Sequence, residues 1–392
     1  MHKILTLNNI SVAGLDRLPR ADYEVSSECS HPDAILVRSA KMHEMTLPET
    51  VKAIGRAGAG VNNIPVDKMT ELGVPVFNAP GANANAVKEL VLAGMLMAAR
   101  NIGQAWEFAR ALEGEDALIN KNVEAGKKNF AGFELPNRTL GVVGLGAIGV
   151  RIANAALSLG MNVIGFDPTI TVRSAWQLES GVRQAMNIDD LLTQSDFVTF
   201  HVPLTDMTRN MINAQRIATM PKNAVLLNFA RDGIIDDEAA VAALESGHLY
   251  AYVCDFPSNL LKNHARCITL PHLGASTKEA EDNCAIMVAE QIKSFLENGN
   301  IVNSVNMPEI NLPRSTGFRL AIINANTPNM VGQISTALAN DGLNIIDMLN
   351  KSREDIAVTL LDVDDEPPMS TLEAIDAIEG VLSVRCLGCA DN

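Results

Sequence analysis

Short apolar runs alternate with longer, helix-like stretches along most of the chain. A first series of runs lies at 4–7, 34–37, 53–54 and 74–78. A second series lies at 139–143, 162–166, 197–200, 224–227 and 251–253. Buried strands that alternate with helices are typical of βαβ units and parallel sheets. We therefore predict an α/β protein with two doubly wound, Rossmann-like domains, followed by a long helix over 278–297.

The C-terminal part of the chain has a separate pattern. Its expected elements are a strand from 318, a helix begun by Pro328, strands at 344–346 and 356–361, a helix over 370–378 and a strand over 381–387. This βαββαβ order predicts a ferredoxin-like domain. Residues 317–392 contain four Lys and Arg but twelve Asp and Glu, so they carry −8 of the chain's net charge of −15. We expect an acidic module that does not bind anions, joined through an extended linker.

The composition excludes several classes of protein. With 392 residues, of which 47% are hydrophobic and 20% charged, the chain is long enough for two or three folded domains. The net charge of −15 argues against a nucleic-acid partner or an anionic membrane. The longest apolar stretch, 86–99, contains Lys88 and Glu89 and is too short to span a bilayer. We expect it to form a buried helix, and we expect no membrane role.

Six cysteines occur without a secretory signal, which favours reduced thiols and a cytoplasmic location. Cys386 and Cys389 have the Cys-x-x-Cys spacing of redox and zinc sites, but no second ligand pair accompanies them. We therefore predict ordinary thiols at these two positions and no metal site.

A glycine-rich turn follows the apolar run at 139–143. It reads Gly144-Leu145-Gly146-Ala147-Ile148-Gly149 and directly precedes a helix over 150–159. In such a turn the first glycine allows the tight bend, the second admits a pyrophosphate close to the backbone, and the third lets helix and strand pack together. Asp167 ends the next strand, where a carboxylate can accept from ribose hydroxyls and repel a 2′-phosphate. The pattern predicts NAD as the cofactor.

Two later strands end in groups that suit hydroxy-acid chemistry. Arg231 follows the run at 224–227, and His272 lies at the end of a further strand. A guanidinium can grip a carboxylate with two hydrogen bonds and polarise a neighbouring carbonyl, whereas an imidazole exchanges protons near neutral pH. Taken singly, such residues are more often a surface ion pair and a structural histidine. Their place at the carboxyl ends of strands in a dinucleotide-binding domain favours a substrate site.

These motifs, together with several others, resemble the D-2-hydroxyacid dehydrogenases over nearly the whole chain. The other motifs span 37–41, 55–63, 78–81, 201–205, 228–233 and 271–277. In this family the substrate lies in a cleft between a substrate-binding domain and a NAD-binding domain. The resemblance implies a substrate-binding domain formed by 1–97 and 278–305, a NAD-binding domain over 98–277, a linker over 306–316 and an ACT regulatory domain over 317–392.

The resemblance also implies roles for individual residues. Arg231 would bind the substrate carboxylate, and His272 would be the catalytic acid and base. The cofactor would be bound by Gly144, Gly146, Ala147, Ile148, Gly149, Asp167, His201, Pro203, Ala230, Asp255 and Gly274. The substrate would be bound by the side chains of Arg38, Lys41 and Arg56 and by the backbone of Ala59, Gly60 and Val61. An L-serine effector would be bound between paired subunits by Asn324, Asn326 and Asn344. The alternative is a domain that only dimerises, in which these asparagines serve the backbone turns.

The resemblance implies an activity as well. The members of the family that this chain resembles oxidise 3-phosphoglycerate to 3-phosphohydroxypyruvate, which begins serine synthesis. We therefore expect an NAD-dependent dehydrogenase that removes a hydride from C2 of this phosphorylated 2-hydroxy acid, assembled as a homodimer or homotetramer. Two alternatives stay open. One is a dehydrogenase for a non-phosphorylated acid such as hydroxypyruvate or glyoxylate, and the other is a non-catalytic NAD-binding regulator.

One position departs from the family pattern. The family has a glutamate that hydrogen-bonds the catalytic imidazole, and Asn259 stands in its place. The aspartate of the same motif is displaced to Asp255, with Cys254 at its usual position. An amide can orient an imidazole ring, but it carries no charge to stabilise the imidazolium that forms when the ring takes a proton. Asp255 is the alternative partner for the ring.

Overall fold

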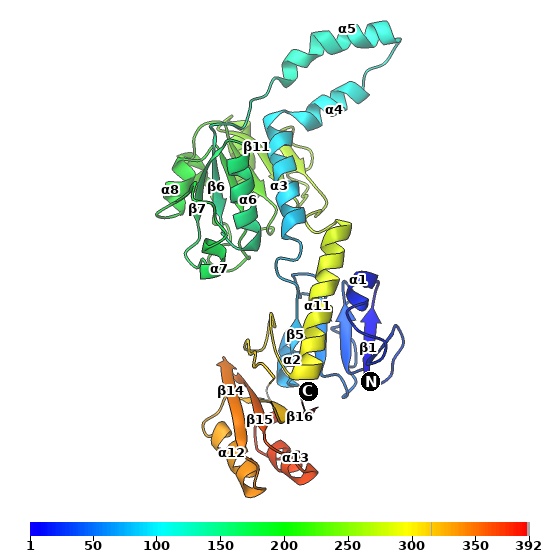
Figure 1. Ribbon diagram of the computed structural model, residues 1–392. Helices are drawn as coiled ribbons and strands as arrows, with labels where there is room; N and C mark the ends of the chain where they lie inside the picture. The colour runs from blue at the N-terminus through cyan, green and yellow to red at the C-terminus, as the bar shows by residue number, and fades with distance from the viewer. Residues whose placement is uncertain (315, 390–392) are drawn as a thin grey trace. The chain divides into compact units, whose positions relative to one another are not determined.

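The computed structural model describes residues 1–314 and 316–389. Its contacts divide the chain into two compact units, Met1–Ala82 with Glu281–Asn392, and Asn83–Ala280. The first unit holds a five-stranded parallel sheet and a four-stranded antiparallel sheet, and the second holds a seven-stranded parallel sheet (Figure 1). This architecture confirms the predicted fold class. The predicted boundaries of the individual domains stay a prediction.

The amino-terminal sheet of the first unit is parallel throughout. Across the sheet, its strands are β2 (Tyr23–Ser26), β1 (His2–Leu7), β3 (Ala34–Val37), β4 (Ala53–Arg56) and β5 (Val76–Phe77). Alternate residues of these strands face opposite sides. Ile4 and Leu36 share a core with the apolar side of α11 (Lys278–Asn298), whereas Leu5 and Val37 share one with α2 (Val66–Glu71). The short helix α1 (Val12–Leu15) approaches α11 closely at Gly14, where a Cβ would lie 2.6 Å from that of Ala285.

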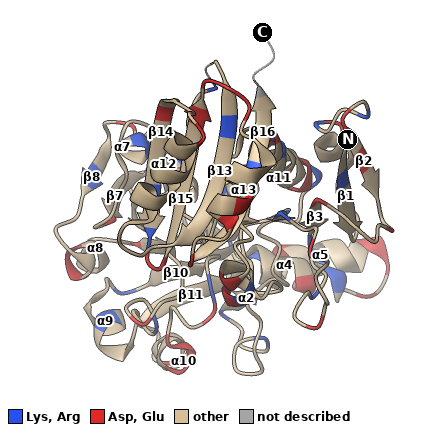
Figure 2. Ribbon diagram, turned by 90° about the horizontal axis from the view of Figure 1, so that it is seen from below, with Lys and Arg blue, Asp and Glu red and all other residues tan. Residues whose placement is uncertain are grey.

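The C-terminal sheet is antiparallel and has the predicted βαββαβ connection. Its strands, in order across the sheet, are β14 (Ile345–Arg353), β15 (Ile356–Val363), β13 (Phe318–Ala325) and β16 (Val381–Cys389). Two helices, α12 (Met330–Asn340) and α13 (Met369–Asp376), cover one face, and the charged residues of α13 are acidic (Figure 2). The helix expected to begin at Pro328 begins at Met330, because Asn329 before it takes a left-handed conformation with a φ of 70°.

The other face of the C-terminal sheet is buried within the same unit. Ile323 and Val358 share a hydrophobic core with Phe295, near the end of α11. The segment that follows α11, predicted from the sequence to be an extended linker, packs into this core as well. Met307 and Ile310 are each 1% exposed. The segment is therefore extended but held in place, because its apolar side chains are buried.

The second unit is built on a parallel sheet with helices on both faces. From edge to edge, the strands are β12 (Cys267–Thr269), β11 (Leu249–Cys254), β10 (Ala224–Asn228), β9 (Phe197–Phe200), β6 (Thr139–Val143), β7 (Asn162–Phe166) and β8 (Val182–Gln184). One face is covered by α3 (Ala84–Ala99) and α6 (Ala147–Ser158), and the other by α8 (Ile188–Thr193), α9 (Ala214–Thr219) and α10 (Asp237–Glu245). A short helix, α7 (Val172–Ala175), follows β7. The strand order reverses at β6, and such a switch point is where doubly wound folds bind ligands.

The apolar stretch at 86–99 forms the buried helix α3, as predicted. After it, α4 (Ile102–Arg110), α5 (Asp116–Gly126) and the 3-10 helix η1 (Lys127–Phe130) extend away from the parallel sheet of the same unit (Figure 1). Three large apolar side chains of this arm, Ile102, Trp106 and Leu118, are 45%, 59% and 48% exposed. In the part of the chain that the structure describes, no helix is long and apolar enough to cross a membrane.

Candidate active site

The loops that carry the predicted cofactor and catalytic residues lie at one edge of the seven-stranded sheet. All of its strands are parallel, so their carboxyl ends share that edge. His272, Asp255 and Arg231 follow the neighbouring strands β12, β11 and β10. His201 and Gly144 follow β9 and β6, the next two strands across the sheet. The second unit therefore gathers its predicted site residues along the edge where Rossmann-like folds bind ligands.

The glycine-rich turn between β6 and α6 has a shape that accommodates a dinucleotide. Gly144 has a φ of 89°, and a Cβ there would lie 2.5 Å from the carbonyl oxygen of His201. A Cβ on Gly149 would lie 1.9 Å from the carbonyl oxygen of Gly144, so only glycine allows helix and strand to pack this closely. A Cβ on Gly146 would meet no atom within 4 Å, which leaves room beside the backbone for a pyrophosphate. The first turn of α6 adds N–H groups that lack partners within the helix.

Asp167 lies directly after β7, beside this turn. Its carboxylate accepts hydrogen bonds from the backbone N–H of Leu145 and from that of Thr169, both at 2.8 Å. The carboxylate therefore holds the glycine-rich turn in place, a role that the sequence analysis did not assign. Carboxylate oxygens have further lone pairs, so the same group can accept from a ribose hydroxyl.

His201 follows β9 and supports the turn from the other side. Its N–H donates to the carbonyl oxygen of Val143 at 2.8 Å. In the side chain, Nε2 lies 2.8 Å from Oγ1 of Thr199, and Nδ1 is buried without a hydrogen-bond partner. Burial lowers the pKa of His201 to about 3, so the ring is neutral near pH 7. The contacts of His201 and of nearby Pro203 with NAD stay a prediction.

The loop after β10 presents Arg231 to solvent. Asn228 is 1% exposed and spans this loop: its Nδ2 donates to the carbonyl oxygen of Arg231 at 2.9 Å, and its Oδ1 accepts from the N–H of Ala230 at 3.2 Å. The guanidinium donates from Nη1 to the carbonyl oxygen of Ala230 at 2.6 Å, and no carboxylate of the described residues is paired with it. An exposed guanidinium of this kind can bind a carboxylate through two hydrogen bonds.

Asp255 fastens the histidine loop to the end of β11. The residue is 1% exposed, and its carboxylate accepts from the N–H of Leu273 at 2.8 Å and from the N–H of Gly274 at 2.9 Å. The N–H of His272 in turn donates to the carbonyl oxygen of Asp255 at 3.1 Å. Both carboxylate oxygens are thus bound to the backbone next to the histidine. Contacts of Asp255 and Gly274 with the cofactor stay a prediction.

His272 combines an exposed side chain with an unusual backbone. Its φ is 56°, a left-handed conformation that is disfavoured for residues other than glycine. The imidazole lies edge-on to the ring of Phe256, with the ring centroids 5.3 Å apart. Within residues 1–314 and 316–389, the ring nitrogens form no hydrogen bond, and Asn259 is exposed. Neither Asn259 nor the backbone-bound carboxylate of Asp255 is placed as a partner of the imidazole.

The cations predicted to bind the substrate lie in the first unit. A cavity of about 580 Å³ contains two of them and is lined by Ser39, Lys41, His43, Arg56, Asn62 and Asn63. The Nε of Arg56 donates to the carbonyl oxygen of Arg38 at 3.1 Å. Arg38 itself does not line this cavity and forms an ion pair with Glu281 of α11. The structure therefore places Lys41 and Arg56 together and gives Arg38 a carboxylate partner.

The loop at 59–61 lies in the same unit as these cations. The side chain of Asn78 donates from Nδ2 to the carbonyl oxygen of Ala59 at 2.6 Å and so holds the loop. The N–H groups of Ala59, Gly60 and Val61 have no backbone acceptor in the part of the chain that the structure describes. Open N–H groups in a row are suited to an anionic group such as a carboxylate.

The three asparagines predicted to bind L-serine do not meet within one chain. Asn324 is 1% exposed near the end of β13, and its Oδ1 has no hydrogen-bond partner. Asn326, two residues later, donates from Nδ2 to the carbonyl oxygen of Glu354 at 2.9 Å. β13 and β14 both pair antiparallel with β15, so they run in the same direction. Asn344 precedes the start of β14, and it therefore lies at the opposite end of the sheet from Asn324 and Asn326. A site that uses all three asparagines requires a second copy of the chain.

Sequence reasoning missed the residues that support the site. Asn228 gave a signal, since it is a polar residue at the end of a buried strand, but no role was assigned to it. Glu281 gave none, because it lies 243 positions from its partner Arg38. Among the described residues, no group of three or more His, Cys, Asp or Glu side chains could hold a metal ion. Cys389, the second cysteine of the Cys-x-x-Cys pair, lies in β16, but its side chain is not among the parts that the structure describes.

Comparison with known proteins assigns the chain to a family. Residues 92–274 match the family model described as "D-isomer specific 2-hydroxyacid dehydrogenase, NAD binding domain". The D-3-phosphoglycerate dehydrogenase of Escherichia coli (strain K12) is 32% identical over 352 residues, which cover 86% of this chain and 82% of that protein. The chain belongs to the D-isomer-specific 2-hydroxyacid dehydrogenase family. The match to its NAD-binding domain confirms the predicted cofactor.

Other members of this D-2-hydroxyacid dehydrogenase family extend the comparison. The D-3-phosphoglycerate dehydrogenase of Methanocaldococcus jannaschii is 40% identical over 296 residues, which cover 73% of this chain and 54% of that protein. This chain thus spans about half the length of that relative. A crystal structure of NAD+-bound 3-phosphoglycerate dehydrogenase from Entamoeba histolytica is 27% identical, with a TM-score of 0.60, and the match covers 78% of this chain and 98% of that one.

Proposed function

We propose that the protein oxidises 3-phosphoglycerate to 3-phosphohydroxypyruvate with NAD, the first step of serine biosynthesis. The observation that carries this proposal is the cavity that holds Lys41 and Arg56 together in the first unit. Two cations in one cavity suit a phosphate group, and they stand out in a chain with a net charge of −15. The D-3-phosphoglycerate dehydrogenases among its relatives, at 32% and 40% identity, support the same substrate.

The proposed reaction removes a hydride from C2 of the substrate and a proton from the hydroxyl group on C2. Arg231 would hold the substrate carboxylate with two hydrogen bonds and polarise the C2 oxygen as it becomes a carbonyl. His272 would take the hydroxyl proton on a ring nitrogen. The N–H groups of Ala59, Gly60 and Val61 would bind the carboxylate as well. The glycine-rich turn from Gly144 to Gly149 would hold NAD, which would supply the acceptor for the hydride from C2.

The C-terminal sheet is proposed to be an ACT regulatory domain that binds L-serine between two subunits. Its ferredoxin-like topology supports this role. The positions of Asn326 and Asn344 at opposite ends of the sheet also support it, because a second subunit could bring the two ends together. The domain boundaries proposed are 1–97 with 278–305 for the substrate, 98–277 for NAD, 306–316 for the linker and 317–392 for the ACT domain.

A homodimer or homotetramer is proposed as the working form. The exposed apolar residues Ile102, Trp106 and Leu118 on α4 and α5 support it, because exposed apolar side chains on a projecting arm are suited to contact with a second copy of the chain. A cytoplasmic location is proposed as well. It is supported by the free thiols of Cys254 and Cys284, which are buried and unpaired.

The test compares NADH oxidation with 3-phosphohydroxypyruvate and with hydroxypyruvate, for the wild type and for Lys41→Gln. We expect the phosphorylated acid to be strongly preferred, and Lys41→Gln to lower kcat/KM for it by about 30-fold, the scale of losing one charged hydrogen bond. Hydroxypyruvate should be unaffected by the variant. Lys222→Gln, which changes an exposed lysine of the other unit, is the matched control.

Three outcomes would contradict parts of the proposal. Equal kcat/KM for both acids would favour a dehydrogenase of non-phosphorylated 2-hydroxy acids. Binding of NADH without turnover of either acid, or of glyoxylate, would favour a non-catalytic NAD-binding regulator. Equal losses on both acids in Lys41→Gln would show that this lysine supports the fold rather than the phosphate.

A further inference from the structure

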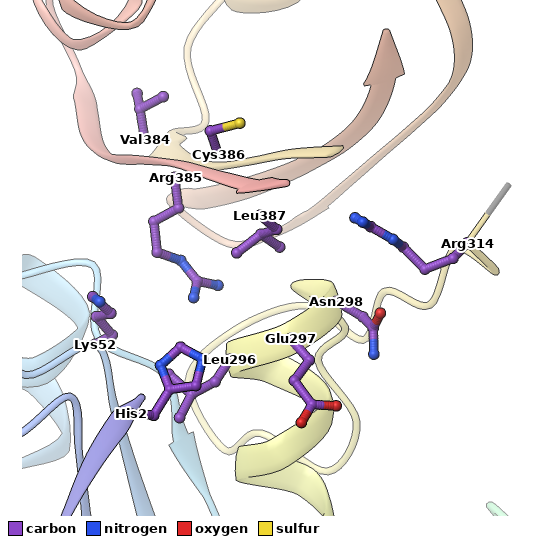
Figure 3. A pocket seen from close by; sticks show the side chains of 10 residues that line it. All are labelled: His2, Lys52, Leu296, Glu297, Asn298, Arg314, Val384, Arg385, Cys386 and Leu387. Atoms are coloured by element: carbon purple, nitrogen blue, oxygen red, sulfur yellow. The ribbon is translucent and has the colours of Figure 1, made fainter. Parts of the chain in front are cut away.

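A second cavity in the first unit lies where the C-terminal sheet meets the amino-terminal domain. Its volume is about 810 Å³, within the range of small-molecule sites. Three parts of the chain contribute its walls: the amino-terminal sheet, the end of α11 with the segment after it, and β16 (Figure 3). The lining residues are His2, Lys52, Leu296, Glu297, Asn298, Arg314, Val384, Arg385, Cys386 and Leu387. None of them belongs to the candidate active site.

Two arginines in this cavity have hydrogen-bond capacity to spare. Arg314 donates from Nη2 to the carbonyl oxygen of Gly388 at 2.8 Å, and its Nη1 is buried without a partner. Arg385 donates from Nη2 to the carbonyl oxygen of Phe295 at 3.1 Å, and its guanidinium lies 4.1 Å from the centre of the Phe295 ring. Neither arginine forms an ion pair with a carboxylate of the described residues. Figure 3 shows both side chains reaching the space between β16 and the end of α11.

The remaining charged groups leave this space positive. Lys52 also lines the cavity, and its Nζ lies 2.7 Å from Oδ1 of Asp33. Glu297 is the one carboxylate among the lining residues, and its Oε1 accepts from the hydroxyl of Tyr23 at 2.7 Å. In Figure 3 this carboxylate points away from Arg385. The lining therefore carries two arginines without a carboxylate partner and one lysine paired with Asp33, against one carboxylate that is already bound to a hydroxyl.

Burial makes such cations costly unless an anion accompanies them. It lowers the pKa of Arg385 to about 10, which reflects the penalty on a guanidinium removed from water. A guanidinium in this position is stabilised by a ligand oxygen that carries negative charge. The carboxylate of Asp33 acts in the opposite direction on Arg385 but is paired with Lys52. Although residues 317–392 carry a net charge of −8, none of their acidic side chains is among the residues that line the cavity.

We propose that this cavity binds a small anion through phosphate or carboxylate oxygens held by Arg314 and Arg385. The ligand would contact β16 on one side and the amino-terminal domain on the other, through Lys52. Its binding would therefore tighten the attachment of the C-terminal sheet to the end of α11. This proposal departs from the expectation that the acidic module takes no part in anion binding, because it depends on the local charge of the cavity and not on the net charge of the module.

The test measures binding of potassium phosphate and of potassium citrate to the full-length protein by calorimetry, with potassium chloride added to equal ionic strength. We use Lys41→Gln throughout, so that phosphate binding in the proposed substrate cavity is weakened. In this background, Arg314→Gln should weaken binding of the tighter anion by about tenfold or more. Arg353→Gln, an exposed arginine at the end of β14, should leave it unchanged. The tighter of the two anions tells whether the site prefers phosphate or carboxylate.

A second measurement does not depend on variants. Hydrogen exchange of the backbone amides of Val384–Leu387 should slow when the tighter anion is added to the wild type, because the ligand would connect β16 to Lys52 and the end of α11. Exchange in α12, on the far face of the sheet, should change less. Unaltered exchange at Val384–Leu387, or equal affinity in Arg314→Gln and its background, would overturn the proposal. Activity should persist in Arg314→Gln, since this residue lies outside the candidate active site.

Discussion

Arg319 and Asp362 form a buried ion pair with two parallel hydrogen bonds in the C-terminal sheet. The bonds run from Nε to Oδ1 and from Nη2 to Oδ2, both at 2.7 Å, and the side chains are 0% and 2% exposed. The two residues stand opposite each other on β13 and β15. The same guanidinium donates to the carbonyl oxygens of Leu312 and Pro313, at 2.6 Å and 3.0 Å. One side chain thus ties the C-terminal sheet to the segment that follows α11.

The first prediction is a loss of stability in Arg319→Met. The variant leaves the carboxylate of Asp362 buried without its guanidinium and removes the donor for the carbonyl oxygens of Asn298, Leu312 and Pro313. We expect the free energy of unfolding to fall by about 3–5 kcal/mol, measured by chemical denaturation. Replacing both residues, Arg319→Met with Asp362→Leu, should recover part of the loss, because no unpaired charge remains. This role would be contradicted if the free energy of unfolding of Arg319→Met equalled that of the exposed control Arg353→Gln.

The second prediction concerns the carboxylate of Asp255. In Asp255→Asn, one of the two acceptors becomes an NH2 group that faces the N–H of Leu273 or Gly274. The loop that carries His272 should shift, and kcat/KM should fall on the order of 100-fold, the scale of misplacing a reacting group by about 1 Å. As a sign of positioning, the amides of Leu273 and Gly274 should exchange faster. Unchanged exchange with lost activity would instead indicate direct contact with the cofactor or substrate.

The third prediction is a pH dependence of stability at Asp237, the first residue of α10. Burial and the nearby carboxylate of Asp232 raise the pKa of Asp237 to about 6. The folded state therefore binds more protons than the unfolded state between about pH 4 and pH 6, so stability falls as the pH rises through this window. Asp237→Asn removes the penalty, and its Tm should exceed that of the wild type at pH 7 but match it near pH 4.

Glu238 provides the control for this prediction. It lies in the same first turn of α10 and is exposed, so Glu238→Gln removes a charge that favours the helix N-terminus without relieving burial. Its Tm should be unchanged or slightly lower than that of the wild type at pH 7. A Tm difference between Asp237→Asn and the wild type that stays constant from pH 4 to pH 7 would contradict the assignment.

The features that the sequence predicted correctly are local ones. The strands at 139–143 and 162–166 and the turn from Gly144 to Gly149 form as expected, because apolar runs and closely spaced glycines act over a few residues. The βαββαβ order of the C-terminal sheet could be inferred for the same reason. Such signals establish which elements form and in which order the chain connects them.

Contacts between distant parts of the chain could not be predicted in this way. Arg319 and Asp362 are 43 positions apart, and Arg38 and Glu281 are 243 apart, so no spacing pairs them. The placement of Asp255 shows the same limit. Its motif suggested a cofactor ligand or a partner for the imidazole, and it gave no sign that both oxygens accept hydrogen bonds from the backbone N–H groups of Leu273 and Gly274. The position of a side chain depends on the tertiary structure, not on the motif that contains it.

The last prediction concerns L-serine and rests on the two ends of the C-terminal sheet. Asn326 lies beyond the end of β13, and Asn344 precedes β14 at the opposite end, so a site that uses both takes one from each of two subunits. Asn326→Ala and Asn344→Ala should each abolish L-serine binding. A mixture of the two variants, unfolded together and refolded, should regain binding, because a mixed dimer contains one site with both asparagines intact.

Calorimetry and inhibition of NADH oxidation by millimolar L-serine would measure this recovery, with Asn340→Ala, at the exposed end of α12, as the control. Coupling of about 1–3 kcal/mol would appear as a several-fold or greater fall in activity. Binding that returns in the mixture cannot arise within one chain, because every chain in it lacks one of the two amides. If the wild type binds L-serine but the mixture does not, Asn326 and Asn344 do not form one site across two subunits. If the wild type does not bind it at all, the C-terminal sheet serves assembly or the anion cavity beside β16.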